Sequence, residues 1–174
     1  ATRPARCALG AEFAISAALV EDGIPVLATV FNPITDEFFS SVRGEGIYLN
    51  GQRTTVSHTT PDRLTILASR SECKAGKFKP FEPHADIRPV GSIAYKLALV
   101  GAGKADATIS LDPKNEWDIA AGVLLVQESG GRVTDKEGSP FVFNRKDTLV
   151  SGVVAANAGV WGVVDRLIHE SIGQ

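Results

Sequence analysis

The fold of this chain is decided by the stretch WDIAAGVLLVQESGG, residues 117–131. Its apolar residues predict a helix over 118–129, which the glycine pair at 130–131 ends. Asp118 stands at the start of that helix, where free backbone N–H groups and the helix dipole stabilise a carboxylate. The same position also suits a Mg²⁺ ligand, because carboxylate oxygens are what this ion prefers. Spacing alone leaves both interpretations of Asp118 open.

Composition places the chain among ordinary globular proteins. It has 174 residues, 44% hydrophobic and 22% charged, with a net charge of -2. No basic field suggests nucleic acid, and no apolar run approaches the roughly 20 residues that span a bilayer. We expect a cytoplasmic protein whose two cysteines, Cys7 and Cys73, are reduced. The sequence contains no Met, so we expect a processed, trimmed or partial chain.

Two patterns follow one another along the sequence. Alternating apolar residues and the turn pairs at Asp22-Gly23 and Asn50-Gly51 predict an antiparallel meander over residues 12–57. Strands and helices alternate from residue 64 onward, which favours an α/β layer. We therefore predict an α+β or α/β protein with an N-terminal sheet lobe, residues 1–60, and a C-terminal α/β lobe, residues 61–174.

A second motif, Gly91-Ser92-Ile93-Ala94, precedes another predicted helix. Ser92 is a natural N-cap after a glycine turn. The same arrangement also forms an anion- or hydroxyl-binding helix N-terminus. In contrast, residues 101–104 lack the spacing of a phosphate-binding loop and are interpreted as a helix C-terminus.

Taken in order, several segments resemble the inositol monophosphatase family of Mg²⁺-dependent, lithium-sensitive phosphatases. The resemblance covers residues 12 to about 157, and the Trp-Asp-x-Ala-Ala-Gly run is one of two family signatures. The segments that carry it are residues 18–27, 32–33, 43–46, 49–51, 91–94 and 117–122, with Glu128, Gly130 and Gly131. The fold that the resemblance implies is a layered αβαβα sandwich.

The resemblance also implies roles for individual residues. Asp118 corresponds to a metal-ligating residue that helps to orient the attacking water, so it is both the metal and the catalytic candidate. Gly91, Ser92 and Ala94 correspond to a loop that contacts the substrate. Lys114 and Glu116 fall where family members vary their substrate contacts, and they form a candidate specificity patch.

The departures from the family pattern matter as much. The first signature, Asp-Pro-Ile/Leu-Asp-Gly-Thr, and an upstream Gly-Glu-Glu segment are absent from this sequence. The chain therefore resembles the C-terminal two thirds of a family member, and the remaining Mg²⁺ ligands are absent from it. We expect the sandwich to lack its N-terminal helices and part of its first sheet, which leaves apolar sheet surface exposed. We also expect weak Mg²⁺ binding and little activity from this chain alone.

The leading functional interpretation is Mg²⁺-dependent hydrolysis of a small phosphate monoester such as inositol monophosphate. The runner-up is a 3'(2'),5'-bisphosphate nucleotidase, and a third hypothesis is a non-catalytic fragment or binding module. The expected partner is a small phosphorylated polyol or nucleotide, with no macromolecular nucleic acid and no membrane. Family members are commonly homodimers, so a homodimer is expected.

Overall fold

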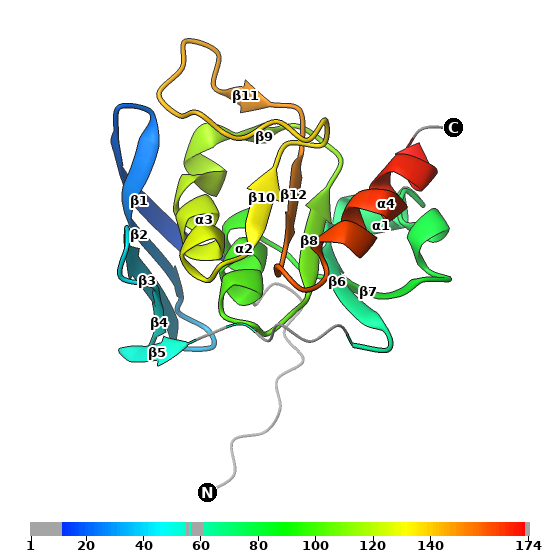
Figure 1. Ribbon diagram of the computed structural model, residues 1–174, viewed down its shortest axis with the longest axis horizontal. Coiled ribbons are helices and arrows are strands. Elements are labelled where there is room, and N and C mark those ends of the chain that lie inside the picture. Colours follow the sequence, from blue (N-terminus) through cyan, green and yellow to red (C-terminus); the bar gives the residue numbers. More distant parts are fainter. Residues whose placement is uncertain (1–11, 55, 57–60, 173–174) are drawn as a thin grey trace, which may run out of the picture.

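A computed structural model describes residues 12–54, 56 and 61–172 of the chain. These residues form four layers, which follow one another from left to right in Figure 1: a sheet, a pair of helices, a second sheet and a second group of helices. The residues assigned to the predicted termini, 1–11 and 173–174, and those around the predicted lobe boundary, 57–60, lie outside the described part.

The first sheet is an antiparallel meander of five strands in sequence order. Its strands are β1 (Ile15–Glu21), β2 (Ile24–Asn32), β3 (Glu37–Val42), β4 (Ile47–Leu49) and β5 (Gln52–Thr54). Both predicted hairpins are confirmed. Asp22 and Gly23 have φ of 49° and 80°, and Asn50 and Gly51 have φ of 51° and 78°, the left-handed pairs that tight hairpin turns require.

The second sheet is mixed, with strand order β10-β12-β8-β6-β7. β6 pairs in parallel with both β7 and β8, whereas β12 pairs antiparallel with β8 and β10. Its strands are β6 (Leu64–Ala68), β7 (Ala85–Pro89), β8 (Ala107–Ser110), β10 (Arg132–Thr134) and β12 (Val153–Ala156). A two-stranded ladder of β9 (Lys114–Asn115) and β11 (Leu149–Val150) lies apart from it; the sequence pattern did not predict this ladder.

Two helices, α2 (Ile93–Gly101) and α3 (Glu116–Glu128), lie between the sheets. They pack closely, because a Cβ at Gly122 would stand 2.5 Å from Leu97 Cβ. The glycine of the opening motif thus lets the two helix backbones approach one another. On the first-sheet side, the helix pair buries Ala28, Val30 and Phe39.

The far side of the second sheet is covered by α4 (Trp161–Ile172), α1 (Arg70–Lys74) and the short 3-10 helix η1 (Lys79–Phe81). The sequence between residues 74 and 83 reads as polar. Phe78 and Phe81 from this stretch are nevertheless buried in the core cluster on this side of the sheet. Two aromatic residues are too few to show a helical period, so the sequence predicted only a fragment and a loop here.

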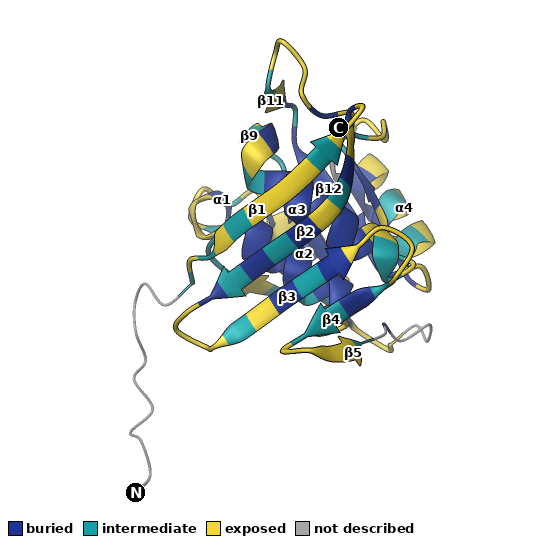
Figure 2. Cartoon of the chain, turned by 90° about the vertical axis from the view of Figure 1, so that its left-hand side faces the viewer, coloured by how far each residue is buried: buried dark blue, intermediate teal, exposed yellow. Residues whose placement is uncertain are grey.

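The expected sandwich is confirmed in the order of its layers. The described residues build the β, α, β and α layers of the predicted αβαβα arrangement. Figure 2 shows the side of the first sheet that faces away from the helices, where exposed residues alternate with buried ones. Its large apolar residues are exposed, as predicted; they are Ile15, Leu19, Leu27, Phe38 and Val42.

The predicted division into lobes 1–60 and 61–174 stays a prediction. Helices of the second range pack on the sheet of the first, and core residues from both ranges belong to one cluster. Within the described residues, no helix combines the length and the apolar character needed to cross a membrane.

Candidate functional site

The main candidate site is a cavity of about 390 Å³ beside the start of α2. It lies where the parallel strands β6 and β7 end, since Ser69 directly follows one strand and Val90 and Gly91 follow the other. Ligands of open α/β sheets bind in the crevice outside the carboxyl ends of parallel strands. The lining residues are Ser69, Arg70, Ser71, Val90, Gly91, Ser92, Ile93, Lys96 and Lys114.

Gly91 is required here for its lack of a side chain. A Cβ at this position would stand 2.4 Å from Arg70 Nη2 and 2.6 Å from the Glu12 carbonyl oxygen. The Gly91 N–H donates to Glu12 Oε2 at 2.6 Å, and the same carboxylate lies 3.6 Å from Arg70. The turn before α2 therefore already holds one carboxylate from the segment before β1.

Ser92 is the N-cap of α2, as predicted. Its Oγ accepts a hydrogen bond from the Tyr95 N–H at 3.3 Å. Its φ of 57° is unusual for a residue with a side chain, and such strain concentrates at functional sites. Ala94, the third substrate-contacting candidate, has its side chain buried in the core between α2 and the first sheet, so any contact it makes with a substrate has to come from its backbone.

Three cationic side chains line the cavity from three different elements. Arg70 comes from α1, and Lys114, from β9, donates to the carbonyl oxygens of Asp112 and Pro113 at 2.9 and 3.2 Å. Lys96, one turn after Ser92 on α2, is only 2% exposed. Burial lowers the pKa of the Lys96 ammonium to about 8, although Glu72 opposes the shift.

Asp118 lies in the first turn of α3, as its third residue, and is half-buried. Asn115, rather than Asp118, occupies the N-cap position, because the helix begins at Glu116, two residues earlier than predicted. Asp118 is therefore a first-turn acid. It lies outside the lining of the cavity that contains Gly91 and Ser92.

The described residues fit part of a Mg²⁺ site and not the whole of one. Mg²⁺ takes one or two carboxylates and completes its shell with water and phosphate oxygens, so the half-buried carboxylate of Asp118 is a suitable single ligand. Among the residues that the structure describes, no three His, Cys, Asp or Glu side chains form a group able to hold a metal ion. The further ligands would have to come from elsewhere.

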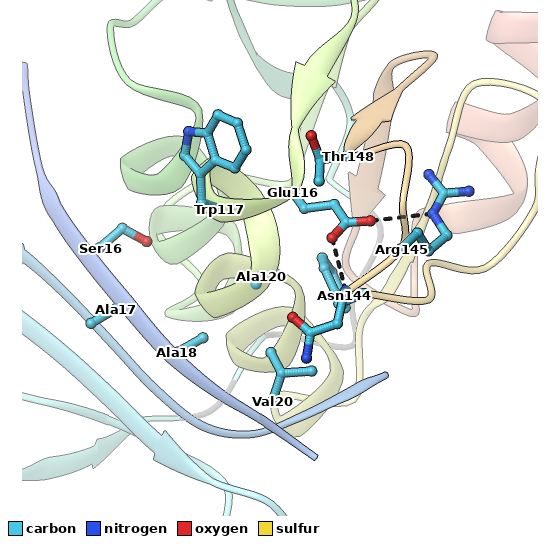
Figure 3. A pocket seen from close by; sticks show the side chains of 11 residues that line it. Ser16, Ala17, Ala18, Val20, Glu116, Trp117, Ala120, Asn144, Arg145 and Thr148 are labelled. Atoms are coloured by element: carbon cyan, nitrogen blue, oxygen red, sulfur yellow. Dashed lines mark hydrogen bonds and ion pairs between the residues drawn. The ribbon is translucent and has the colours of Figure 1, made fainter. Parts of the chain in front are cut away.

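Glu116 has a structural role at the start of α3, which Figure 3 shows. Glu116 is 6% exposed, and its carboxylate accepts hydrogen bonds from the Asn144 N–H at 2.8 Å and from Arg145 Nε at 3.2 Å. It lines a separate cavity of about 560 Å³ between β1 and α3, together with the exposed Trp117. Since Lys114 lines the other cavity, the two residues do not form the single specificity patch that the sequence suggested.

Sequence reasoning missed Lys96, Arg70 and Glu72. Glu72 is buried and accepts from the N–H groups of Leu111 and Asp112 at 2.7 and 2.6 Å, which fixes the chain as it leaves β8. The one available signal was the four-residue spacing from Ser92 to Lys96, which puts both on one side of a helix. Nothing in the sequence shows that the Lys96 side chain is buried.

Comparisons with known proteins agree with this architecture. A sequence profile described as "Inositol monophosphatase family" matches residues 9–173. The chain is 38% identical over 159 residues to the Nus factor SuhB of Escherichia coli, which covers 85% of this chain and 57% of that protein. It is 31% identical to inositol monophosphatase 2 of Solanum lycopersicum, over 90% of this chain and 61% of that protein.

A solved structure shares the fold. The Thermotoga maritima IMPase superimposes with a TM-score of 0.79 at 29% identity, over 92% of this chain and 62% of that one. The chain thus spans about three fifths of the length of the relatives that it matches.

Proposed function

The chain belongs to the inositol monophosphatase family, and from this premise we propose that the complete gene product is a Mg²⁺-dependent phosphatase of small phosphate monoesters such as inositol monophosphate. The observation that carries the proposal is the turn at Gly91 and Ser92. It opens a helix beside a cavity lined by cations, at the carboxyl ends of two parallel strands. A phosphorylated polyol or nucleotide has the charge and hydroxyl groups that such a cavity selects.

Residues of this chain would contribute binding and orientation. The start of α2 offers backbone N–H groups to an anion or a hydroxyl group, and the strained Ser92 turn fixes their direction. The carboxylate of Asp118 would supply one metal ligand and accept a hydrogen bond from a water molecule. When bound, Mg²⁺ would polarise the phosphoryl oxygens and lower the pKa of a water molecule.

The 174-residue chain alone is proposed to bind catalytic Mg²⁺ weakly and to have little activity. Asp118 is one carboxylate, and the described residues offer no group of three metal-ligating side chains. The match covers about three fifths of the length of the relatives, so about two fifths of their length lies outside it. The remaining ligands are therefore assigned to polypeptide outside the described residues.

The test of this function is Asp118→Asn in the complete gene product. The amide keeps the size of the side chain but loses the negative charge, so we expect Mg²⁺-dependent release of phosphate from inositol 1-phosphate to fall by at least roughly 100-fold. Asp165→Asn is the matched control, because Asp165 is a half-buried helical carboxylate on α4, on the far side of the second sheet. Equal turnover by the two variants would contradict a role of Asp118 as a metal ligand and would leave it the role of an acid that stabilises the start of α3.

Three further properties belong to the same proposal: a cytoplasmic location, a homodimer and no macromolecular nucleic acid partner. The homodimer is checked by sedimentation of the complete gene product. A bisphosphate nucleotidase is the second candidate, because three cationic side chains, Arg70, Lys96 and Lys114, line the cavity.

A further inference from the structure

The first sheet ends on one side in a strand that lacks the features that usually protect a sheet edge. β1 (Ile15–Glu21) pairs with β2 alone, so its other side is open within the described residues. Its sequence, ISAALVE, contains no Lys, Arg or Pro, and its one charged residue, Glu21, adjoins the hairpin turn. Natural proteins keep sheet edges short or place charges and prolines in them, because an unprotected edge pairs with another strand.

The other edges of the two five-stranded sheets are protected in this way. β5 and β10 have three residues each and contain Arg53 and Arg132. β7 contains Asp86 and Arg88 and ends at Pro89. Of these four edges, β1 alone is both long and nearly uncharged. The contrast marks β1 as the edge at which a further strand is able to pair.

The hydrogen bonds of the first sheet show which backbone groups of β1 are open. The Val26 carbonyl oxygen accepts from the Arg43 N–H at 2.9 Å, so the even-numbered residues of β2 bond toward β3 and the odd-numbered ones toward β1. The β1 partners of those odd-numbered residues are Ile15, Ala17 and Leu19. The N–H and C=O groups that point away from β2 consequently belong to Ser16, Ala18 and Val20.

The edge of β1 is also accessible on both faces of the sheet. Leu19 on the outer face is 61% exposed, and Ala18 on the side of the helices is exposed as well. On that side a cavity of about 560 Å³ follows the strand, and Figure 3 shows Ser16, Ala18 and Val20 along it, with Trp117 of α3 on the other wall. A neighbouring strand therefore has room to approach the open backbone groups.

The sequence of β1 is complementary to a second copy of itself. An antiparallel pairing about a twofold axis at Ala18 gives each of its seven residues a partner, and the open residues then face one another and exchange their backbone hydrogen bonds. The residue pairs between the two copies are Ser16–Val20, Ala18–Ala18, Ala17–Leu19 and Ile15–Glu21. On the outer face a small residue thus lies opposite a large one, and no like charges are opposed.

We propose that the 174-residue chain forms a twofold dimer through β1, in which the first sheets of two copies join edge to edge into one continuous sheet. A twofold axis is the commonest symmetry of homo-oligomers. The pairing extends the sheet sideways and leaves its outer face open. The homodimer expected for the complete gene product has no assigned surface, whereas this dimer has one, and it does not rest on the phosphatase function. Because the contact consists mainly of a few backbone hydrogen bonds, we expect a dissociation constant in roughly the micromolar range.

Sedimentation of the 174-residue chain from about 1 to about 300 μM tests the dimer. Ala18→Pro removes an N–H that points away from β2, so the pairing of β1 with β2 is kept, and proline is tolerated in edge strands. One intermolecular hydrogen bond is lost from each copy, and we expect the dissociation constant to rise by at least roughly tenfold. Thermal unfolding checks that the variant is folded. A chain that stays monomeric throughout, or a folded variant that dimerises as strongly as the unsubstituted chain, would overturn the proposal.

Disulfide cross-linking tests the register and does not need the proline variant to fold. Ala18→Cys is made in a chain whose own cysteines are replaced, as Cys7→Ser and Cys73→Ala, and is oxidised with glutathione disulfide. The Cα atoms of a hydrogen-bonded antiparallel pair lie about 5.5 Å apart, a separation that suits a disulfide, so we expect a covalent dimer.

Val20→Cys in the same chain is the matched control. Its counterpart in the second copy is four residues out of register, roughly 13 Å away along the strand, so this variant should cross-link at least about tenfold more slowly. Equal cross-linking of the two variants, or none with Ala18→Cys, would contradict a dimer centred on Ala18.

Discussion

The two faces of the first sheet are built from the same strands and have opposite environments. Phe39 of β3 points toward the helix pair and is 0% exposed, whereas its neighbour Phe38 points away from it and is 42% exposed. In β1 the outer-face residue Leu19 is 61% exposed. The difference shows that this sheet is held from one side, by α2 and α3, while its other side carries an apolar surface without a partner in the described residues.

The largest expected loss of stability is at the inner face of the first sheet, the face that packs on α2 and α3. Phe39→Ala would leave a cavity between the sheet and the helix pair, and such truncations cost about 3–5 kcal/mol. Phe38→Ala removes an already exposed ring, so its cost should stay below roughly 1 kcal/mol. Chemical denaturation of both variants of the 174-residue chain makes the comparison. Similar losses would show that the outer face is also buried in solution, for example against a second copy.

A second test concerns the buried charge in the helix layer. The pKa of Lys96 falls from its ordinary 10.5 to about 8, and one pKa unit corresponds to about 1.4 kcal/mol. The unpaired ammonium therefore costs on the order of 3 kcal/mol at pH 7. We expect Lys96→Met to raise the melting temperature at that pH. The cost of burying the Lys96 ammonium would thus be visible as lost stability.

The gain from Lys96→Met should depend on pH with a definite sign. Below pH 8 the lysine is charged in both the folded and the unfolded chain, so the penalty is complete. Between pH 8 and 10.5 only the unfolded chain stays charged, and the penalty fades as pH rises. The surrounding groups are Glu72, Cys73 and Glu12, which favour the ammonium, and Lys114, which opposes it. A gain that grows between pH 8 and 10.5 would contradict the burial of Lys96.

A substitution at the contact between α2 and α3 is expected to lower the stability of the chain by a smaller amount. Gly122→Ala places a Cβ against Leu97, and such overpacking typically costs about 1–3 kcal/mol. Gly162→Ala is the control, because a Cβ at this position of α4 meets nothing within 4 Å. It should be neutral or stabilise by up to about 1 kcal/mol, the helix preference of Ala over Gly. Thermal unfolding that ranks the two substitutions the other way would contradict the close approach of α2 and α3.

The smallest effect is expected at the outer face. In the 174-residue chain, Leu19→Asp should change the free energy of unfolding by no more than about 0.5 kcal/mol, as for other exposed positions. Val163→Asp on α4, which is also exposed, is the control. In a longer gene product that covers this face, Leu19→Asp should cost at least about 2 kcal/mol more than in the short chain, because a charge would then be buried. An equal effect in both forms would show that the outer face stays open.

Much of the fold follows from local patterns. The hairpins at Asp22-Gly23 and Asn50-Gly51 require positive φ at both turn residues. Asp, Asn and Gly tolerate that conformation, so the residue types themselves predict the turns. The Ser92 N-cap and the apolar helix after Trp117 follow from similarly local chemistry. The β9–β11 ladder was missed because it joins two residues to two others far along the chain, a pairing without a local signal.

The candidate site was only partly predictable for a related reason. The turn at Gly91 and Ser92 is recognisable in sequence, and so is the position of Asp118 in a first turn. The burial of Lys96 depends on how α1, α2 and β9 pack together, and no periodic pattern in the sequence predicts that packing. Glu116, which the family resemblance placed in a specificity patch, accepts a hydrogen bond from the backbone N–H of Asn144, a contact between positions 28 residues apart.

The most direct test of the account compares phosphate release by the purified 174-residue chain and by the complete gene product, with inositol 1-phosphate and adenosine 3',5'-bisphosphate at saturating Mg²⁺. If Asp118 is one ligand of a metal site completed by polypeptide outside the described residues, the short chain should stay near background while the complete product turns over. Mg²⁺-dependent release by the 174-residue chain at the rate of the complete product would contradict the central claim.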